Sequence, residues 1–492
     1  MPEGLSLVAI APEAVLVAGV LAVLVAEVTL SPAPASRLRL LGGVTAAALL
    51  GALGTTIWQW AEGSGRGEGL FYSGMVVLDG FGALARLVLI LLAALALGAA
   101  WPLVEQLGRR GAEFLALVLV SLTGMILMAA SANLLMLFLA LEVASISLYV
   151  LAGMGRVQVE GDEAALKYFL LGSFASAVFL YGVALTYGAT GTLSLYELGG
   201  LLAERVITAP GVFLAGMALL MVGLAFKVSA APFHMWSPDV YQGAPAGAVS
   251  FMAAGAKVAG FAALSRVLVV GLGSQRADWA PAVAVLAAIS LLVGTALAIT
   301  QSDIRRMLAY SSIAHAGFIL TGLVAGEEGL TGVWFYLATY GVQLIGAFAA
   351  VAVVAGPAAG RSALADYGGL SERSPFVAGV LSLMMVAMGG IPLTTGFVGK
   401  VGVFSAALEA GYLWLVVLGL LASVAGLFFY LRVIVLMYMQ APALAEAPGT
   451  APARPQAAGL VRLVLTTTVA ITLAFGIFPG PLLELIGSAL PL

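Results

Sequence analysis

The chain has 492 residues, of which 62% are hydrophobic and 9% are charged, and its formal net charge is −3. A soluble domain carries about a quarter charged residues, so this composition excludes a water-soluble globular protein. The sequence contains no cysteine and two histidines, so the chain itself has no thiolate ligands for a metal or an iron–sulfur cluster. No basic patch indicates nucleic acid, and we expect no cofactor in this chain.

Apolar runs of about twenty residues recur from end to end, and each is long enough to cross the hydrocarbon layer as a helix. Backbone groups in lipid must be hydrogen-bonded within their own segment, and the alternating pattern of a membrane barrel is absent. The predicted fold is therefore an all-α polytopic membrane protein. The first run lacks a basic leader and is expected to be a retained helix. The fourteen predicted spans lie near residues 6–28, 38–58, 81–101, 112–130, 133–153, 163–188, 211–236, 245–272, 278–300, 304–324, 329–356, 374–408, 411–439 and 459–480.

The segments between spans divide the chain into units. Residues 59–80 are a Gly-rich loop with a short extended piece, and residues 192–206 are expected to form a short interfacial helix. Spans four to eight and nine to thirteen form two blocks of five, an odd number, so the second block begins on the opposite membrane face. Two such blocks have opposite orientations in the membrane, which predicts an inverted repeat. The predicted units are an N-terminal three-helix segment (1–111), the first five-helix repeat (112–272), the second, inverted repeat (278–439), a linker (440–458) and a C-terminal helix (459–492).

The arginines predict the orientation. If the N-terminus is outside, twelve of the seventeen arginines lie on the cytoplasmic side and five lie on the outer side or in the outer half of a span. The positive-inside rule favours this arrangement. We therefore expect both termini on the outer side of a cytoplasmic membrane.

All four lysines lie in apolar stretches: Lys167, Lys227, Lys257 and Lys400. A charged group within a span is costly, so such residues are rare and usually line an internal polar path. Burial brings an amine within range of proton exchange at neutral pH. A lysine that extends its ammonium to the membrane surface, or one held in a structural ion pair, is the alternative that we weigh for Lys227.

Two of these lysines lie near prolines that interrupt a span. Lys227 precedes Pro232 by five residues, and Lys400 follows Pro392 by eight. A proline within a helix frees the carbonyl four residues earlier, here those of Val228 and Met388. Broken helices at membrane depth are tolerated where they line a cavity, so both breaks are expected to border a polar interior.

Glu142 lies at the middle of the span 133–153. An ionised carboxylate there needs a partner, and we expect that partner to be Lys227. The alternative is a protonated Glu142 hydrogen-bonded to a neighbouring helix. Lys257 lies at the centre of its span among small residues, which leave room for water or a close helix, so a functional role is favoured over extension to the surface.

Three further residues are weaker candidates for proton transfer. Lys167 follows Glu163 by four residues, which is equally explained by a surface ion pair on one helix. His315 lies in an apolar span, and the alternatives for it are a proton relay and a satisfied structural histidine. Thr339, Tyr340 and Gln343 of the next span could hold water beside it. His234 follows a helix break. It is expected either to shape the break or to titrate at the cytoplasmic rim of the membrane.

Charges near the membrane surfaces have a simpler interpretation. Asp303, Arg305 and Arg306 read as a charge cluster at a helix end, and Asp79 is a candidate structural partner for Arg86.

Together these motifs resemble the antiporter-like membrane subunits of respiratory complex I. The similarity rests on three segments, 226–239, 301–315 and 396–400, which contain Phe226, Lys227, Pro232, His234, Asp303, Arg305, Arg306, His315 and Lys400. Within the family, residues 240–245 and the lysine at position 400 are most similar to the subunit N type.

The resemblance implies two inverted five-helix bundles with broken helices seven and twelve, and proton-transfer roles for Glu142, Lys227, Lys257 and Lys400. It implies the membrane subunits M, K and J as partners in a hetero-oligomer. NADH, FMN, iron–sulfur clusters and quinone would then belong to partner subunits. The implied function is proton translocation coupled to quinone reduction elsewhere in the complex. The alternatives are a subunit of a multi-subunit cation/proton antiporter and a structural scaffold that pumps nothing.

Overall fold

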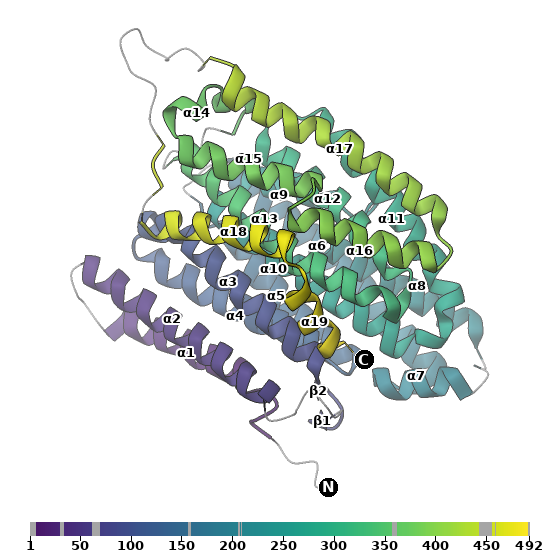
Figure 1. Cartoon of the computed structure of the whole chain (residues 1–492). Coiled ribbons are helices and arrows are strands. Elements are labelled where there is room, and N and C mark those ends of the chain that lie inside the picture. Colours follow the sequence, from purple (N-terminus) through teal and green to yellow (C-terminus); the bar gives the residue numbers. More distant parts are fainter. Residues whose placement is uncertain are drawn as a thin grey trace.

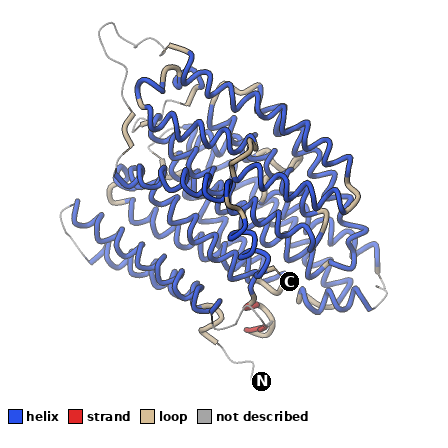
Figure 2. The backbone as a smooth tube through the Cα atoms, viewed as in Figure 1, coloured by secondary structure: helices blue, strands red, loops and turns tan. Residues whose placement is uncertain are grey.

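Long helices run side by side through the computed structural model, with α1 and α2 at one edge and α17 at the opposite edge (Figure 1). The structure describes residues 6–29, 34–61, 69–155, 159–204, 207, 209–356, 362–441, 455–457 and 459–490. Helix dominates throughout (Figure 2), and the described strands are the antiparallel pair β1 (Gly69–Phe71) and β2 (Val76–Leu78). The helices are α1 (Ala11–Thr29), α2 (Pro34–Gln59), α3 (Gly80–Leu107), α4 (Arg110–Ala130), α5 (Leu134–Ala152), α6 (Val159–Thr190), α7 (Leu195–Glu204), α8 (Pro210–Lys227), α9 (Trp236–Gly243), α10 (Ala246–Arg266), α11 (Arg276–Ile299), α12 (Ile304–Leu323), α13 (Leu330–Ala355), α14 (Leu370–Arg373), α15 (Pro375–Gly389), α16 (Thr395–Glu409), α17 (Leu413–Met439), α18 (Gly459–Ile477) and α19 (Gly480–Ala489).

Twelve helices of the described chain are long and apolar enough to cross a membrane. An all-α, multi-pass membrane protein is therefore confirmed. Two of the fourteen predicted spans fall outside this set. The first is α12, which has Arg305 and Arg306 in its first turn and lies against α11. The second is the predicted span 374–408, which consists of α15 and α16, each 15 residues long.

The helices break near both prolines. Helix α8 ends at Lys227, the chain forms turns through residues 228–235, and α9 begins at Trp236. Helix α15 ends at Gly389, Gly390 adopts a left-handed conformation with φ of 83°, and α16 begins at Thr395.

The shorter predicted elements are partly present. The interfacial helix expected at 192–206 is α7, and the extended piece of the Gly-rich loop is β2. Most of the predicted linker 440–458 lies outside the described residues. The short helix α19, which follows the last span, was not predicted. The described N- and C-terminal ends lie at the same end of the bundle (Figure 1).

Small residues let neighbouring helices approach closely, as is common in membrane bundles. A Cβ atom on Gly124 of α4 would lie 2.5 Å from the main-chain nitrogen of Ala144 in α5. A Cβ atom on Gly294 of α11 would lie 2.4 Å from the main-chain nitrogen of Ala314 in α12. Both contacts require glycine, since real Cβ atoms do not approach a neighbouring atom this closely.

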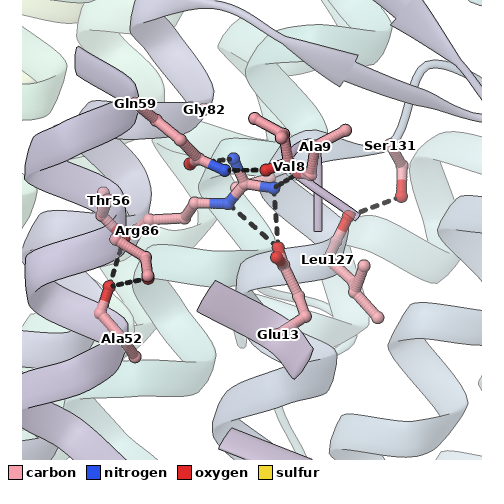
Figure 3. Close-up of polar contacts among 12 residues, drawn as sticks. Val8, Ala9, Glu13, Ala52, Thr56, Gln59, Gly82, Arg86, Leu127 and Ser131 are labelled. Atoms are coloured by element: carbon pink, nitrogen blue, oxygen red, sulfur yellow. Dashed lines mark hydrogen bonds and ion pairs between the residues drawn. The ribbon is translucent and has the colours of Figure 1, made fainter. Parts of the chain in front are cut away.

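Buried ion pairs join the N-terminal helices to the rest of the bundle. Arg86 of α3 donates to Glu13 of α1 from Nε at 2.9 Å and from Nη2 at 2.7 Å, as Figure 3 shows. It also donates to the side-chain oxygen of Gln59 in α2 at 3.3 Å and to the carbonyl of Ala9 at 3.2 Å. One guanidinium group therefore contacts α1, α2 and the segment before α1.

Asp79 pairs with Arg266 of α10, so the predicted Asp79–Arg86 pair is wrong. The two guanidinium nitrogens of Arg266 lie 2.7 and 3.0 Å from the carboxylate oxygens of Asp79. Asp79 also accepts from the Gly82 amide at 2.7 Å and so caps α3. Burial alone would raise the pKa of Asp79, but Arg266 and the Gly82 amide hold it below its ordinary value.

Candidate functional site

Three buried lysines lie in the interior of the bundle, and the half-buried Glu142 of α5 lies near Lys227. The side chains of Lys227, Lys257 and Lys400 are only 5%, 3% and 6% exposed. They come from α8, α10 and α16, which pack directly or through shared neighbours. None of the three ammonium groups therefore reaches the surface of the molecule.

The carboxylate of Glu142 in α5 accepts a short hydrogen bond from the Ser176 hydroxyl of α6. Lys227 donates to the Ser145 hydroxyl at 2.7 Å, one helical turn after Glu142. Among the described side chains, Glu142 and Lys227 form no direct ion pair, because each group bonds to a serine. The carboxylate still acts on the ammonium group through space.

A small pocket joins these two serines. It is lined by Lys227, Ser145, Ser176 and the aromatic rings of Tyr149 and Tyr168, and it has room for about one water molecule. A water molecule with hydroxyl and ammonium partners would be well bonded there. The pocket is thus suited to connect the Glu142–Ser176 pair with the Lys227–Ser145 pair.

Glycine brings Lys227 close to the helix that carries Lys257. A Cβ atom on Gly260 of α10 would lie 2.8 Å from Cγ1 of Val228 and 3.3 Å from Cγ of Lys227. Gly260 follows Lys257 by three residues, so both lie on the same side of α10. The ammonium of Lys257 donates to the Ser312 carbonyl of α12 and lies 5.8 Å from the centre of the Tyr340 ring.

His315 lies between Lys257 and Lys400, and the positive charges of both act on its ring. Its Nδ1 is 2.8 Å from the Tyr336 hydroxyl and its Nε2 is 3.0 Å from the Tyr430 hydroxyl. The Tyr430 hydroxyl also bonds to Ser311. The imidazole stacks on the Tyr340 ring, with ring centres 4.2 Å apart. His315 therefore belongs to a continuous hydrogen-bonded cluster.

Lys400 lies at the second helix break. Its ammonium donates to the Gly389 carbonyl at 2.9 Å and to the Ser423 hydroxyl of α17 at 2.7 Å. The freed carbonyl expected from the sequence was that of Met388; the one that Lys400 uses belongs to the next residue. The ammonium also lies 4.6 Å from the centre of the Phe318 ring.

The remaining predicted residues lie apart from this interior line. The side chain of Lys167 is 43% exposed and forms ion pairs with Glu163 at 2.7 Å and with Asp239 at 2.8 Å. The pair with Glu163 is the surface ion pair that the sequence offered as the alternative to proton transfer. Asp239 also pairs with Arg306 at 2.6 Å. Asp303 accepts from the Arg306 amide and so caps α12. His234 lies half-buried in the turn between α8 and α9.

Sequence reasoning missed several partners of the buried amines. They are Ser145, Ser176, Ser423, Tyr336 and Tyr430. Serine is common in membrane helices and gives no distinct signal. Tyr336 and Tyr340, four residues apart in one apolar span, do indicate a polar stripe on α13. The Gln343 amide, which was expected to help hold water beside His315, donates to the Thr395 hydroxyl at 2.8 Å.

Comparison with known proteins places this site in a family. The family described as NADH:quinone oxidoreductase/Mrp antiporter, TM matches residues 131–426, which is more than half of the chain. NADH-quinone oxidoreductase subunit N 1 of Solibacter usitatus is 42% identical over 444 residues, or 90% of this chain and 89% of that protein. The chain belongs to the antiporter-like membrane subunits of NADH:quinone oxidoreductase, in the subunit N branch.

The fold of this chain is similar to the folds of solved antiporter-like chains. A chain of respiratory complex I from Thermus thermophilus with bound aureothin is 34% identical, with a TM-score of 0.79, over 97% of this chain and 100% of that chain. A chain of the Mrp complex from Dietzia is 24% identical, with a TM-score of 0.87, over 99% of this chain and 97% of that chain. The second likeness shows the antiporter-like fold alone. Among the described residues of this chain, no group of three or more His, Cys, Asp or Glu side chains could hold a metal ion.

Proposed function

We propose that this chain is a proton-translocating membrane-arm subunit of an NADH:quinone oxidoreductase, in which Glu142, Lys227, Lys257 and Lys400 transfer protons. The observation that carries the proposal is that three interior ammonium groups bond to hydroxyl and carbonyl oxygens rather than to carboxylates. A carboxylate in contact would lock a lysine in its charged form. These amines are instead free to change charge, as a transfer path requires.

The proposed route begins at Glu142. Quinone reduction elsewhere in the complex alters the charge near this carboxylate, which changes the affinity of Lys227 for its proton. The proton passes to Lys257 beside Gly260, then through the His315 cluster to Lys400, and leaves outward. Moving one charge against about 100 mV costs about 2.3 kcal/mol. A change of two units in one lysine pKa supplies about 2.7 kcal/mol, which is of the right size.

Glu142 is well placed to sense a neighbouring subunit. It is half-buried on a face of α5 where Leu139 and Ile146 are 51% and 54% exposed. We propose that this apolar face meets other membrane subunits of a hetero-oligomer, expected to be M, K and J. These partners would carry the NADH, FMN, iron–sulfur and quinone sites, and this chain would carry none.

The inverted repeat is also proposed, with units 112–272 and 278–439 between an N-terminal segment (1–111), a linker (440–458) and a C-terminal helix (459–492). A separation of 170 residues relates Gly124 to Gly294 (294 minus 124) and Ala144 to Ala314 (314 minus 144), the partners in the two close contacts. The same separation relates Asn133 to Asp303, the caps of α5 and α12. Each unit has its break in its fourth span. These matches support equivalent halves.

We place the protein in a bacterial cytoplasmic membrane with both termini on the outer side. The arginine distribution supports the outer side, and the position of both described chain ends at one end of the bundle supports a shared side for the two termini. Arg66, Arg156, Arg205, Arg361 and Arg454, which entered the sequence argument, lie outside the described residues.

The deciding experiment substitutes Lys227→Ala in the intact complex and measures protons pumped per NADH oxidised. We expect a lower ratio in an assembled complex, with Lys167→Ala as the matched control that keeps the ratio. An unchanged ratio in Lys227→Ala would contradict the route. Lost assembly with normal coupling in the remainder would favour the scaffold. Cation-driven exchange without redox partners would favour the antiporter subunit. The similarity to the Dietzia chain is a similarity of fold and does not decide between these functions.

A further inference from the structure

Helices α15 and α18 both begin at the same end of the bundle (Figure 1). A polar pocket lined by residues of both helices opens there. Its volume is about 430 Å³, within the range of small-ligand sites. The polar side chains that line it are Glu372, Arg373, Ser374, Gln456 and Arg462. It is remote from the interior lysines and takes no part in the proposed proton route.

Two guanidinium groups give this pocket its charge. Arg373 donates to the carbonyls of Asp366 at 2.7 Å and Gly368 at 3.1 Å, which fixes it in the wall. The guanidinium carbon of Arg462 lies 5.2 Å from the centre of the Phe376 ring, which holds this exposed side chain at the opening. Glu372 supplies one opposing charge, so the described residues that line the pocket carry a net positive charge.

Apolar side chains continue from the pocket along the outside of the bundle. Phe376 of α15 is 36% exposed, and Leu460 and Leu463 in the first turns of α18 are 43% and 61% exposed. A ligand with a charged head and an apolar tail would therefore find both parts matched. Free phosphate would use the arginines alone.

We propose that this pocket binds the phosphate group of an anionic phospholipid, with its acyl chains against the outer faces of α15 and α18. Guanidinium groups bind phosphate oxygens in a planar, two-point geometry. Basic pockets between membrane helices are the usual sites for anionic headgroups. The bound lipid would join the start of α18 to the start of α15.

The test uses the intact complex in phosphatidylglycerol, with native mass spectrometry counting the lipid molecules retained on this chain. We expect Arg462→Gln to lower retention of one phosphatidylglycerol by about fivefold, the contribution of one arginine near an anionic surface. Glu372→Gln removes the opposing charge and should raise retention. Arg110→Gln, an exposed arginine at the start of α4 outside the pocket, is the matched control and should change nothing.

Equal retention by Arg462→Gln and the unsubstituted complex would overturn the proposal, provided that NADH oxidation shows both to be assembled. Phosphatidylcholine retained as well as phosphatidylglycerol would overturn the preference for an anionic lipid. A third arm adds excess inorganic phosphate. Phosphatidylglycerol that stays bound supports a lipid site, whereas its displacement would assign the pocket to free phosphate and overturn the lipid assignment.

Discussion

The ammonium of Lys400 donates a hydrogen bond to the carbonyl of Gly389, 2.9 Å away, at the residue where α15 ends. A broken helix leaves carbonyls without their usual amide donors. Here a lysine from the continuing helix supplies the donor. The proposed proton carrier is thus also the group that satisfies the break.

Lys400→Met should therefore affect both coupling and stability. The substitution keeps most of the side-chain volume but leaves the Gly389 carbonyl and the Ser423 hydroxyl without the ammonium. An unsatisfied buried polar group costs about 1–3 kcal/mol. We expect fewer protons per NADH and a lower melting temperature of the purified complex. Lys167→Met, at an exposed ion pair worth about 0–1 kcal/mol, should leave both measurements nearly unchanged.

Tyr430→Phe tests the cluster between Lys257 and Lys400. It removes the hydroxyl that bonds His315 and Ser311 while keeping the ring. Loss of a hydrogen bond worth about 1–1.5 kcal/mol should slow proton transfer about five- to tenfold, measured as pumping rate in vesicles. The control is Tyr438→Phe on the same helix, where the side chain is 49% exposed. Equal rates in the two variants would remove the cluster from the route.

Gly260→Ala tests the close approach of α8 and α10. The added Cβ would lie 2.8 Å from Val228 and 3.3 Å from Lys227, so the two helices must separate. Overpacking of this kind costs about 1–3 kcal/mol, and we expect a lower melting temperature together with reduced pumping. Gly43→Ala in α2 meets no atom within 4 Å and should be neutral or slightly stabilising. A Gly260→Ala complex as stable as the Gly43→Ala complex would contradict the packing argument.

Asp79→Asn should destabilise the complex by the same amount at pH 6 and pH 8. The variant leaves Arg266 buried without its counter-charge, which costs about 3–5 kcal/mol. Because the pKa of Asp79 is held below its ordinary value of 3.8, its stabilising effect is complete above pH 3.8 and is lost only as the pH falls through the lower folded value. The measurement is the melting temperature at both pH values, with the exposed Asp278→Asn as control. A loss that shrinks at pH 6 would show that Asp79 titrates there.

Much of the architecture could be predicted from the sequence because lipid imposes length and hydropathy on each span. The same argument identified the interior lysines, since a charged amine within a span is costly and usually lines an internal polar path. Pro232 and Pro392 located both helix breaks. The segment at α12 was placed correctly as a helix, although its arginines make it less apolar than the other spans.

The side-chain pairs could not be predicted in the same way. Arg86 pairs with Glu13, 73 residues away, and Asp79 pairs with Arg266, 187 residues away. Such pairs depend on how helices rotate and shift against one another, which the pattern of a single span does not determine. For the same reason the sequence could not show how Glu142 and Lys227 interact: each group bonds to a serine from another helix, and the two charges act on each other through space.

The hydroxyl partners of Lys227 and Lys400 have one more consequence. A hydroxyl can accept a hydrogen bond from an ammonium group, and after rotation about its C–O bond it can donate one to the lone pair of the neutral amine. Ser145 and Ser423 can therefore stay bonded in both protonation states without any movement of the helices. At these two contacts a change in the protonation state of the lysine therefore requires the turning of one hydroxyl hydrogen and no repacking of the bundle.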